Sequence, residues 1–147
     1  NIKRHGDNKM RNIHEFEVKN LLRMANDAKE RAYVPYSGFR VGACLKGASG
    51  AYYFGCNIEN AAYSPTVCAE RVAMLRAIYE GEREFDALAI VWDGDTPAVP
   101  CGVCRQVLSE FCDGEMPIIC ANRKGEYKMV SLDDLLPYAF SKKDMNL

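Results

Sequence analysis

Residues 68–70 read C-A-E and residues 100–104 read P-C-G-V-C, and each stretch stands at the start of a predicted helix. Cys101 and Cys104 are one helical turn apart, so both sulfur atoms can face the same ion. Cys68 begins the other helix, where unpaired backbone N–H groups and the helix dipole favour a thiolate. Three protein ligands leave one position of a tetrahedral zinc ion open, as in catalytic zinc sites. The sequence therefore predicts a zinc ion bound by these three cysteines.

Glu70 is the residue that we expect to move protons at this site. Its side chain is long enough to reach water on an ion held by Cys68, although it need not be a ligand itself. The two histidines of the chain, His5 and His14, lie in or near the polar N-terminus, which leaves a carboxylate as the acid and base. The alternative is a structural glutamate in the first turn of a helix, where the dipole stabilises its charge.

The C-x-x-C spacing alone allows other chemistry. Cys101 and Cys104 could form a redox-active pair or half of a structural zinc site. The upstream Cys68 and the proline before the pair favour metal binding. Three thiolates on Zn²⁺ leave a net negative charge, and Arg71 and Arg105 are near enough in sequence to offset part of it.

Hydrophobic periodicity predicts strands that alternate with helices. The expected elements are a helix over 18–28, strands over 39–46 and 51–58, a helix over 68–80, a strand over 87–92, a helix over 102–111, strands over 117–121 and 127–130, and a short capped helix from residue 131. This order is typical of one α/β domain. The helix over 68–80 is apolar over most of its circumference, so we expect it to be buried, in part against another subunit.

Length and composition limit the class of protein. A chain of 147 residues is the size of one domain, which we expect over residues 12–147, with residues 1–11 as a disordered or non-native tail. The net charge of −1, with no run of lysine and arginine longer than a dipeptide, gives no support for nucleic-acid binding. No apolar run approaches the roughly 20 residues of a membrane span. Seven cysteines, an odd number, favour a reducing compartment, so we expect a cytoplasmic protein.

Asn57 and Glu59 alternate at strand spacing, so their side chains should point to the same side of the backbone. An amide and a carboxylate placed together can bind the hydroxyl groups of a sugar. The same pair would also fit a solvated strand end, and the two residues alone leave both interpretations open.

Four stretches together resemble one family of enzymes. They read N-I-E-N-A-A-Y at 57–63, C-A-E-R at 68–71, P-C-G-V-C-R-Q-V-L at 100–108 and L-L-P-Y-A-F at 135–140. In these motifs the chain is similar to the small, homotetrameric, zinc-dependent cytidine deaminases. The resemblance implies a three-layer α/β/α fold with a five-stranded mixed sheet. It also implies hydrolysis of cytidine and deoxycytidine to uridine and deoxyuridine with release of ammonia, as in pyrimidine salvage.

The resemblance also implies roles for single residues. It implies Cys68, Cys101 and Cys104 as zinc ligands. It implies Glu70 as the catalytic acid and base, and Arg71 as the residue that tunes the thiolate charge. The residues that it implies for substrate binding are Phe39, Asn57, Glu59, Ala61, Tyr63, Ala69 and Phe140.

Assembly is part of the same resemblance. It implies a homotetramer in which Ala61, Tyr63 and Phe140 reach the sites of neighbouring subunits. The expected partners are therefore a small nucleoside and further copies of this chain, with neither nucleic acid nor a membrane among them.

Three other functions fit parts of the pattern. A related enzyme could act on another aminopyrimidine or aminopurine nucleoside, although Asn57 and Glu59 favour an ordinary ribose. A nucleic-acid editing deaminase is disfavoured by the net charge of −1. A zinc-binding module without activity would leave the ultraviolet absorbance of added cytidine unchanged, whereas deamination changes it.

Overall fold

The computed structural model describes residues 10–146, and within them the chain forms four α-helices and five β-strands. In chain order these are α1 (Glu15–Lys29), β1 (Val41–Gly47), β2 (Tyr52–Cys56), α2 (Ala69–Tyr79), β3 (Phe85–Trp92), α3 (Gly102–Phe111), β4 (Pro117–Ala121), β5 (Tyr127–Ser131) and α4 (Leu132–Leu135). Each element expected from the sequence is present, with ends that differ by a few residues. The predicted α/β fold is confirmed.

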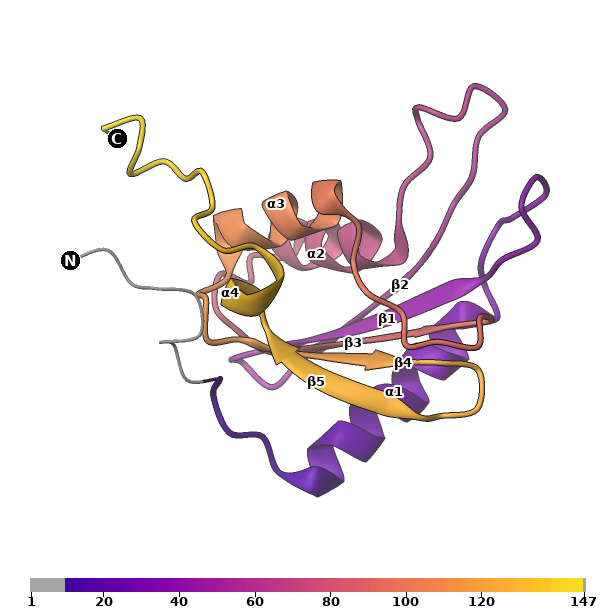
Figure 1. The fold of residues 1–147 in the computed structure, drawn as a ribbon, viewed down its shortest axis with the longest axis horizontal. Coiled ribbons are helices and arrows are strands. Elements are labelled where there is room, and N and C mark those ends of the chain that lie inside the picture. The colour runs from indigo at the N-terminus through magenta and orange to yellow at the C-terminus, as the bar shows by residue number, and fades with distance from the viewer. Residues whose placement is uncertain (1–9, 147) are drawn as a thin grey trace.

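The strands of the described chain form one mixed sheet in the order β2-β1-β3-β4-β5. β1 is antiparallel to both β2 and β3, β3 is parallel to β4, and β4 is antiparallel to β5. It follows that β2, β3 and β4 run in the same direction. The carboxyl ends of β2 and β3 therefore meet at one edge of the sheet, and the helices that follow them start from that edge (Figure 1).

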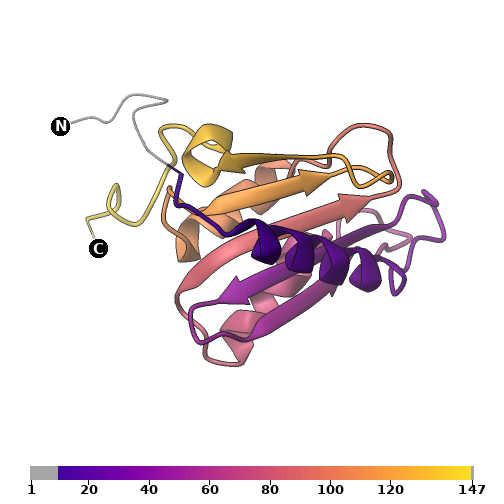
Figure 2. The ribbon, with the colours of Figure 1, turned by 90° about the horizontal axis from the view of Figure 1, so that it is seen from below.

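Helices cover both faces of the sheet. α1 packs on one face, and α2 and α3 lie on the other, as Figures 1 and 2 show from two directions. Leu21 and Ala25 of α1 belong to one apolar core, and Ala73 and Met74 of α2 belong to a second. β3 contributes side chains to both cores, which accounts for its unbroken apolar run from Ala87 to Trp92. The expected three-layer α/β/α architecture with a mixed sheet is confirmed.

Two glycines let the helices approach the sheet closely. A Cβ atom on Gly55 of β2 would lie 2.6 Å from the backbone nitrogen of Ala73 in α2. A Cβ atom on Gly42 of β1 would lie 2.8 Å from the Cα atom of Lys29 in α1, on the opposite face. Both distances are far shorter than a van der Waals contact of about 3.5–4.0 Å. Glycine is therefore required at these positions by the close approach of a helix.

α2 is buried on one side only in this chain. Ala69, Ala73 and Met74 on its inner side are fully buried. Leu75 and Tyr79 on its outer side are 53% and 90% exposed. The prediction of a buried helix is thus confirmed for the side of α2 that faces the sheet. No described residue of the same chain covers its outer side.

The helices within residues 10–146 are short, and none of them is long and apolar enough to span a membrane.

At the start of α1, His14 Nδ1 accepts a hydrogen bond from the Phe16 N–H at 3.0 Å. At α4, Ser131 Oγ accepts from the Asp134 N–H, and the Asp134 carboxylate accepts from the Ser131 N–H. This reciprocal pair is a capping box, and it confirms the short capped helix expected from residue 131.

Part of the expected N-terminal tail is described. Of residues 1–11, residues 1–9 lie outside the described residues. Arg11 Nη1 forms an ion pair with Asp113 at 2.6 Å, and the Arg11 N–H donates to the carbonyl oxygen of Glu115 at 2.8 Å. These contacts join residue 11 to the segment that precedes β4.

We expect Gly55→Ala to lower the free energy of unfolding by about 1–3 kcal/mol, the usual cost of forcing an extra group into a packed core. The added methyl group would push α2 away from β2. Gly102→Ala is the matched control, because that position has open space around it in the first turn of α3, and we expect no loss there. Urea denaturation measures both effects. A Gly55→Ala variant as stable as the native chain would contradict the close approach.

Candidate active site

The starts of α2 and α3 bring three cysteines together. Cys68 is the N-cap residue of α2, and Cys101 is the N-cap residue of α3. Neither side chain forms a capping hydrogen bond with its own helix, so both sulfur atoms remain available to another partner. Cys104 lies in the first turn of α3 and is fully buried. The sheet topology thus unites Cys68 with a cysteine 33 residues away in sequence.

The three sulfur atoms form a compact cluster in which all lie within 4.8 Å of one another. The Sγ atoms of Cys68 and Cys101 are 3.8 Å apart, far beyond the about 2.05 Å of a disulfide bond. Two thiolates bound to one tetrahedral zinc ion at about 2.3 Å each would have their sulfur atoms about 3.8 Å apart. The cluster therefore fits a zinc ion and leaves one position for a further ligand.

The cluster favours negative charge. Each helix start contributes unpaired N–H groups and the positive end of its dipole. Hydrogen bonds from Cys104 and from Arg71 lower the pKa of the Cys68 thiol to about 5, although burial opposes this. The hydrogen bond to Cys68, together with burial, raises the pKa of Cys104. One thiolate therefore forms readily, and a bound cation is needed to ionise its neighbour.

Arg71 supplies positive charge to the cluster. Its Nη2 atom lies 3.6 Å from Cys68 Sγ. Its Nε–H is buried and has no hydrogen-bond partner among the described residues. The guanidinium of Arg105 instead donates to the carbonyl oxygens of Pro100 and Leu135, both at 2.7 Å. Of the two arginines considered from the sequence, Arg71 is thus the one that contacts a thiol.

Glu70 lies in the first turn of α2, beside the thiol cluster. The residue is only 5% exposed. Burial raises the pKa of Glu70 to about 7, and the negative charge of Cys68 acts in the same direction. A carboxyl group with a pKa near 7 can both accept and donate a proton at neutral pH. The structure therefore places a group suited to proton transfer next to the three thiols.

A cavity of about 220 Å³ opens beside the thiols and Glu70. Apolar side chains form most of its wall, and a few polar groups face into it. The lining residues are Val41, Asn57, Thr66, Cys68, Ala69, Glu70, Ile90, Trp92, Ala98, Val99 and Cys101. Apolar walls with a few convergent polar groups are typical of a site for a small molecule.

The expected sugar-binding pair is divided between two adjoining cavities. Asn57 lines the cavity beside the thiols, whereas Glu59 lines a neighbouring cavity of about 410 Å³. Thr66 lines both. The Glu59 carboxylate accepts hydrogen bonds from the N–H groups of Tyr36 and Ser37, at 3.0 and 3.1 Å, and from the Ser37 hydroxyl. The Ser37 hydroxyl lowers the pKa of Glu59, so this carboxylate is ionised at neutral pH.

Comparison with known proteins agrees with this geometry. The family model for the cytidine and deoxycytidylate deaminase zinc-binding region matches residues 16–120. The chain belongs to this family. Zinc is therefore its cofactor, and the cluster of three thiols that can hold the ion lies within the matched region.

Several other proteins are similar to this chain over most of their own length. A cytidine deaminase of Sporosarcina psychrophila is 51% identical over 88% of this chain and 96% of its own. A cytidine deaminase of Halalkalibacterium halodurans is 45% identical over 86% of this chain and 96% of its own. The crystal structure of cytidine deaminase from Burkholderia pseudomallei matches with a TM-score of 0.81 and 42% identity, over 83% of this chain and 98% of its own.

Three more of the residues that the resemblance implies for substrate binding lie in or beside the two cavities of this chain. Ala69 lines the cavity of the thiols. The ring of Phe39 packs against Trp92, with centroids 6.0 Å apart, and so lies at the side of that cavity. Tyr63 lines the cavity of Glu59 and packs edge-on against Tyr36 at 6.2 Å.

Ala61 and Phe140 line neither of the two cavities in this chain. Both are exposed. Phe140 lies beside α3, where Gln106 Nε2 donates to its carbonyl oxygen at 3.0 Å. Within a single chain these two residues therefore take no part in the site.

Sequence reasoning missed part of the cavity wall. Val41, Ile90 and Trp92 line it without having been expected there. A signal was available for Trp92, because it is the only tryptophan and ends the apolar run of residues 87–92, just before the loop that leads to Cys101. Residues at the carboxyl ends of parallel strands commonly line ligand sites in α/β sheets.

We expect one zinc ion per chain in protein purified without added metal, as measured by elemental analysis. Cys104→Ser should remove most of the zinc, because a hydroxyl group does not replace a thiolate ligand. Cys56→Ser is the matched control, since Cys56 is a free thiol outside the cluster, and it should keep the full zinc content. Zinc-free native protein, or disulfide bonds among the clustered cysteines, would sink the assignment.

Proposed function

We propose that this chain is a zinc-dependent hydrolase that converts cytidine and deoxycytidine to uridine and deoxyuridine and releases ammonia. The observation that carries the proposal is a buried carboxyl group, Glu70, beside three clustered thiols, at a small cavity that Glu70, Cys68 and Cys101 line. Relatives at 51% and 45% identity are named cytidine deaminases, which supports a cytosine nucleoside as the substrate.

Cys68, Cys101 and Cys104 hold the zinc ion in this proposal. When bound, zinc acts as a Lewis acid and makes water a strong nucleophile at neutral pH. Arg71 offsets part of the thiolate charge through its contact with Cys68 Sγ at 3.6 Å. Three thiolates reduce the Lewis acidity of a bound zinc ion because they donate negative charge to it. The positive charge of Arg71 counteracts part of this reduction.

Glu70 is the proposed acid and base. Its carboxylate accepts a proton from the attacking water, whose oxygen adds to C4 of the pyrimidine ring. The protonated carboxyl group then donates that proton to N3. Glu70 next takes the second proton from the hydroxyl group now on C4 and passes it to the amino group, so that the C4 carbonyl forms as the C4–N bond breaks and ammonia leaves. Because its pKa is about 7, both protonation states of Glu70 are accessible at neutral pH.

The proposed nucleoside spans the two adjoining cavities. The pyrimidine ring lies beside the thiols, in contact with Ala69 and on the side of Phe39. The ribose extends toward Thr66, where Asn57 and Glu59 bind its hydroxyl groups. The shared lining by Thr66 supports this placement, since it makes the two cavities immediate neighbours.

The proposed active form is a homotetramer in which Ala61, Tyr63 and Phe140 complete the sites of neighbouring subunits. The exposed outer side of α2, with Leu75 and Tyr79, supports an interface. Burial of such apolar surface against another subunit would be favourable at roughly 25 cal/mol per Å². The exposed position of Phe140 beside α3 is compatible with a contact to a neighbour.

The proposed domain comprises residues 12–147, and the proposed place of action is the cytoplasm. Catalysis by this site needs three thiols in the reduced state, which a reducing compartment maintains. The reaction would return cytosine nucleosides to the uridine pool, which is a step of pyrimidine salvage. We propose nucleosides as its substrates, with neither nucleic acid nor a membrane as a partner.

We expect the zinc-loaded protein to change the ultraviolet absorbance of both cytidine and deoxycytidine, and to act on free cytosine about tenfold more slowly or worse. Cytosine lacks the ribose hydroxyl groups that Asn57 and Glu59 are proposed to bind, and each such hydrogen bond is worth about 0.5–1.5 kcal/mol, or about 1.5–3 kcal/mol when one partner is charged. Unchanged absorbance with zinc-loaded protein would show a binding module and not an enzyme. Equal rates on cytosine and cytidine would contradict the ribose assignment.

Glu70→Gln tests the proposed acid and base in the same assay. It keeps the size of the side chain but cannot accept the proton, so turnover should fall by a factor of about 10²–10⁴ with zinc content unchanged. Glu80→Gln at the C-cap of α2 is the matched control and should keep native activity. A Glu70→Gln variant with most of its activity would mean that another residue moves the protons.

Phe140→Ala tests the shared site. We expect about a tenfold loss of kcat/KM, equivalent to ~1.4 kcal/mol of lost contact, with the fold retained. Phe16→Ala on the exposed side of α1 is the matched control and should behave as the native protein. Sedimentation run alongside the assay measures assembly, and a fully active monomer would refute the shared site.

A further inference from the structure

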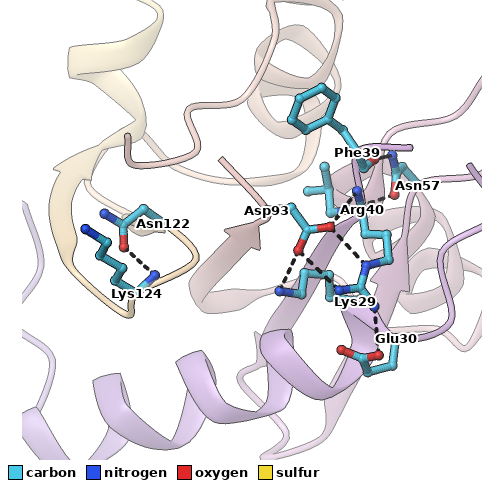
Figure 3. Close-up of polar contacts among 9 residues, drawn as sticks. Lys29, Glu30, Phe39, Arg40, Asn57, Asp93, Asn122 and Lys124 are labelled. Carbon is cyan, nitrogen blue, oxygen red and sulfur yellow. Dashed lines mark hydrogen bonds and ion pairs between the residues drawn. The ribbon is translucent and has the colours of Figure 1, made fainter. Parts of the chain in front are cut away.

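A cluster of charged residues lies behind the cavity wall, where the ends of several strands meet α1 (Figure 3). Asp93 follows β3 and stands at its centre. The Oδ1 atom of Asp93 lies 2.9 Å from Lys29 Nζ, and its Oδ2 atom lies 2.9 Å from Arg40 Nε. Arg40 also pairs with Glu30 at 2.8 Å. The cluster therefore joins the C-terminal end of α1 to the strands on which this helix packs.

Lys29 depends on Asp93 for its charge partner. Lys29 is only 6% exposed, and a buried ammonium group is costly without an ionic partner. Partial burial alone would raise the pKa of Asp93, but hydrogen bonds from Arg40 and Lys29 outweigh this effect and lower the pKa to about 2. Asp93 is thus ionised at neutral pH and balances the buried charge.

The same carboxylate fixes the backbone that leads into β1. The Arg40 N–H donates to Asp93 Oδ2 at 3.2 Å, and the Asp93 N–H donates to the carbonyl oxygen of Arg40 at 3.2 Å. Asn57 holds the same segment from the other side. Its Nδ2 donates to the carbonyl oxygen of Phe39 at 2.9 Å, and its Oδ1 accepts from the Val41 N–H at 2.8 Å. The segment is therefore held between Asp93 and Asn57 (Figure 3).

Three strands each give a residue to the cavity wall at this point. Val41 begins β1, Asn57 follows β2 and Trp92 ends β3, and all three line the cavity. Val41 and Trp92 are paired in register across β1 and β3. A shift of residues 39–41 would therefore displace several parts of the wall at once, including the amide that we assign to the ribose.

We propose that Asp93 is a positioning residue for nucleoside binding, because its ion pairs with Lys29 and Arg40 hold residues 39–41 and thereby aim Asn57 and Trp92 at the nucleoside. This inference rests on the proposed function. Glu70 and the thiols lie at the starts of α2 and α3, the helices on the face of the sheet opposite α1. Loss of the Asp93 charge should therefore weaken substrate binding and leave the zinc content and the chemical step in place.

Asp93→Asn keeps the size of the side chain and one oxygen, and removes the charge. We expect KM for cytidine to rise about tenfold, with kcat within about twofold of the native value and zinc content unchanged. Trp92 is the only tryptophan of the chain, so its fluorescence reports on the cavity wall. Titration with uridine, followed by this fluorescence, should show a Kd about tenfold weaker than that of the native protein.

Asp95→Asn is the matched control. Asp95 stands on the same loop and pairs with Arg123 at 2.7 Å on the protein surface, so its variant should keep the native KM and Kd. If both variants raised KM equally, the effect would be one of general charge near the cavity, and the inference would be overturned.

A double variant separates positioning from stability. Lys29→Met/Asp93→Asn removes the buried ammonium group together with its partner, so it should regain much of the thermal stability that Asp93→Asn loses. KM and the Kd for uridine should nevertheless stay raised, because Arg40 still lacks the Asp93 carboxylate and keeps only its pair with Glu30. Recovery of stability and binding together would overturn the inference. If Asp93→Asn alone does not fold, the double variant supplies the same measurements.

The native protein in the same assays distinguishes the two proposals. If it neither deaminates cytidine nor binds uridine, the proposed function fails and the inference falls with it. If it does both, and Asp93→Asn matches it in KM and Kd, the inference alone fails.

Discussion

The shared direction of β2 and β3 is the constraint on which the site depends. Because both strands are antiparallel to β1, their carboxyl ends meet at one edge of the sheet, and α2 and α3 begin there. Each helix carries a cysteine at its N-cap, where the dipole favours a thiolate. Reversal of either strand would separate Cys68 from Cys101 by the length of a strand. Metal binding is therefore a consequence of the sheet topology.

Close packing of α2 against the sheet determines the chemistry of Glu70. Gly55 has no side chain, and the backbone of α2 therefore lies directly on β2. Glu70 lies in the first turn of this closely packed helix and is only 5% exposed, and this burial raises its pKa to about 7. A helix held further from the sheet would admit water, and the pKa would return toward about 4.3. The packing that stabilises the fold thus also makes Glu70 able to exchange protons at neutral pH.

The order of elements and the thiol cluster could be predicted from the sequence, because both depend on short-range patterns such as hydrophobic periodicity and the C-x-x-C spacing. The divided positions of Asn57 and Glu59 could not. Strand spacing predicts a shared side, but β2 ends at Cys56, so the alternation does not continue through these residues. The contact of Arg40 with Asp93 joins residues that are 53 positions apart, so no local sequence pattern predicts it either. No described residue of this chain covers the outer side of α2, so the sequence pattern of one chain does not predict what covers it.

X-ray absorption at the zinc edge of the native protein tests the central claim most directly, because it counts the sulfur neighbours of the ion. We predict three sulfur atoms at about 2.3 Å and one lighter atom in the fourth position. Four sulfur neighbours would mean a closed structural site. A majority of nitrogen or oxygen neighbours would mean that the ion is bound away from the starts of α2 and α3, and either result would contradict a catalytic zinc held by Cys68, Cys101 and Cys104.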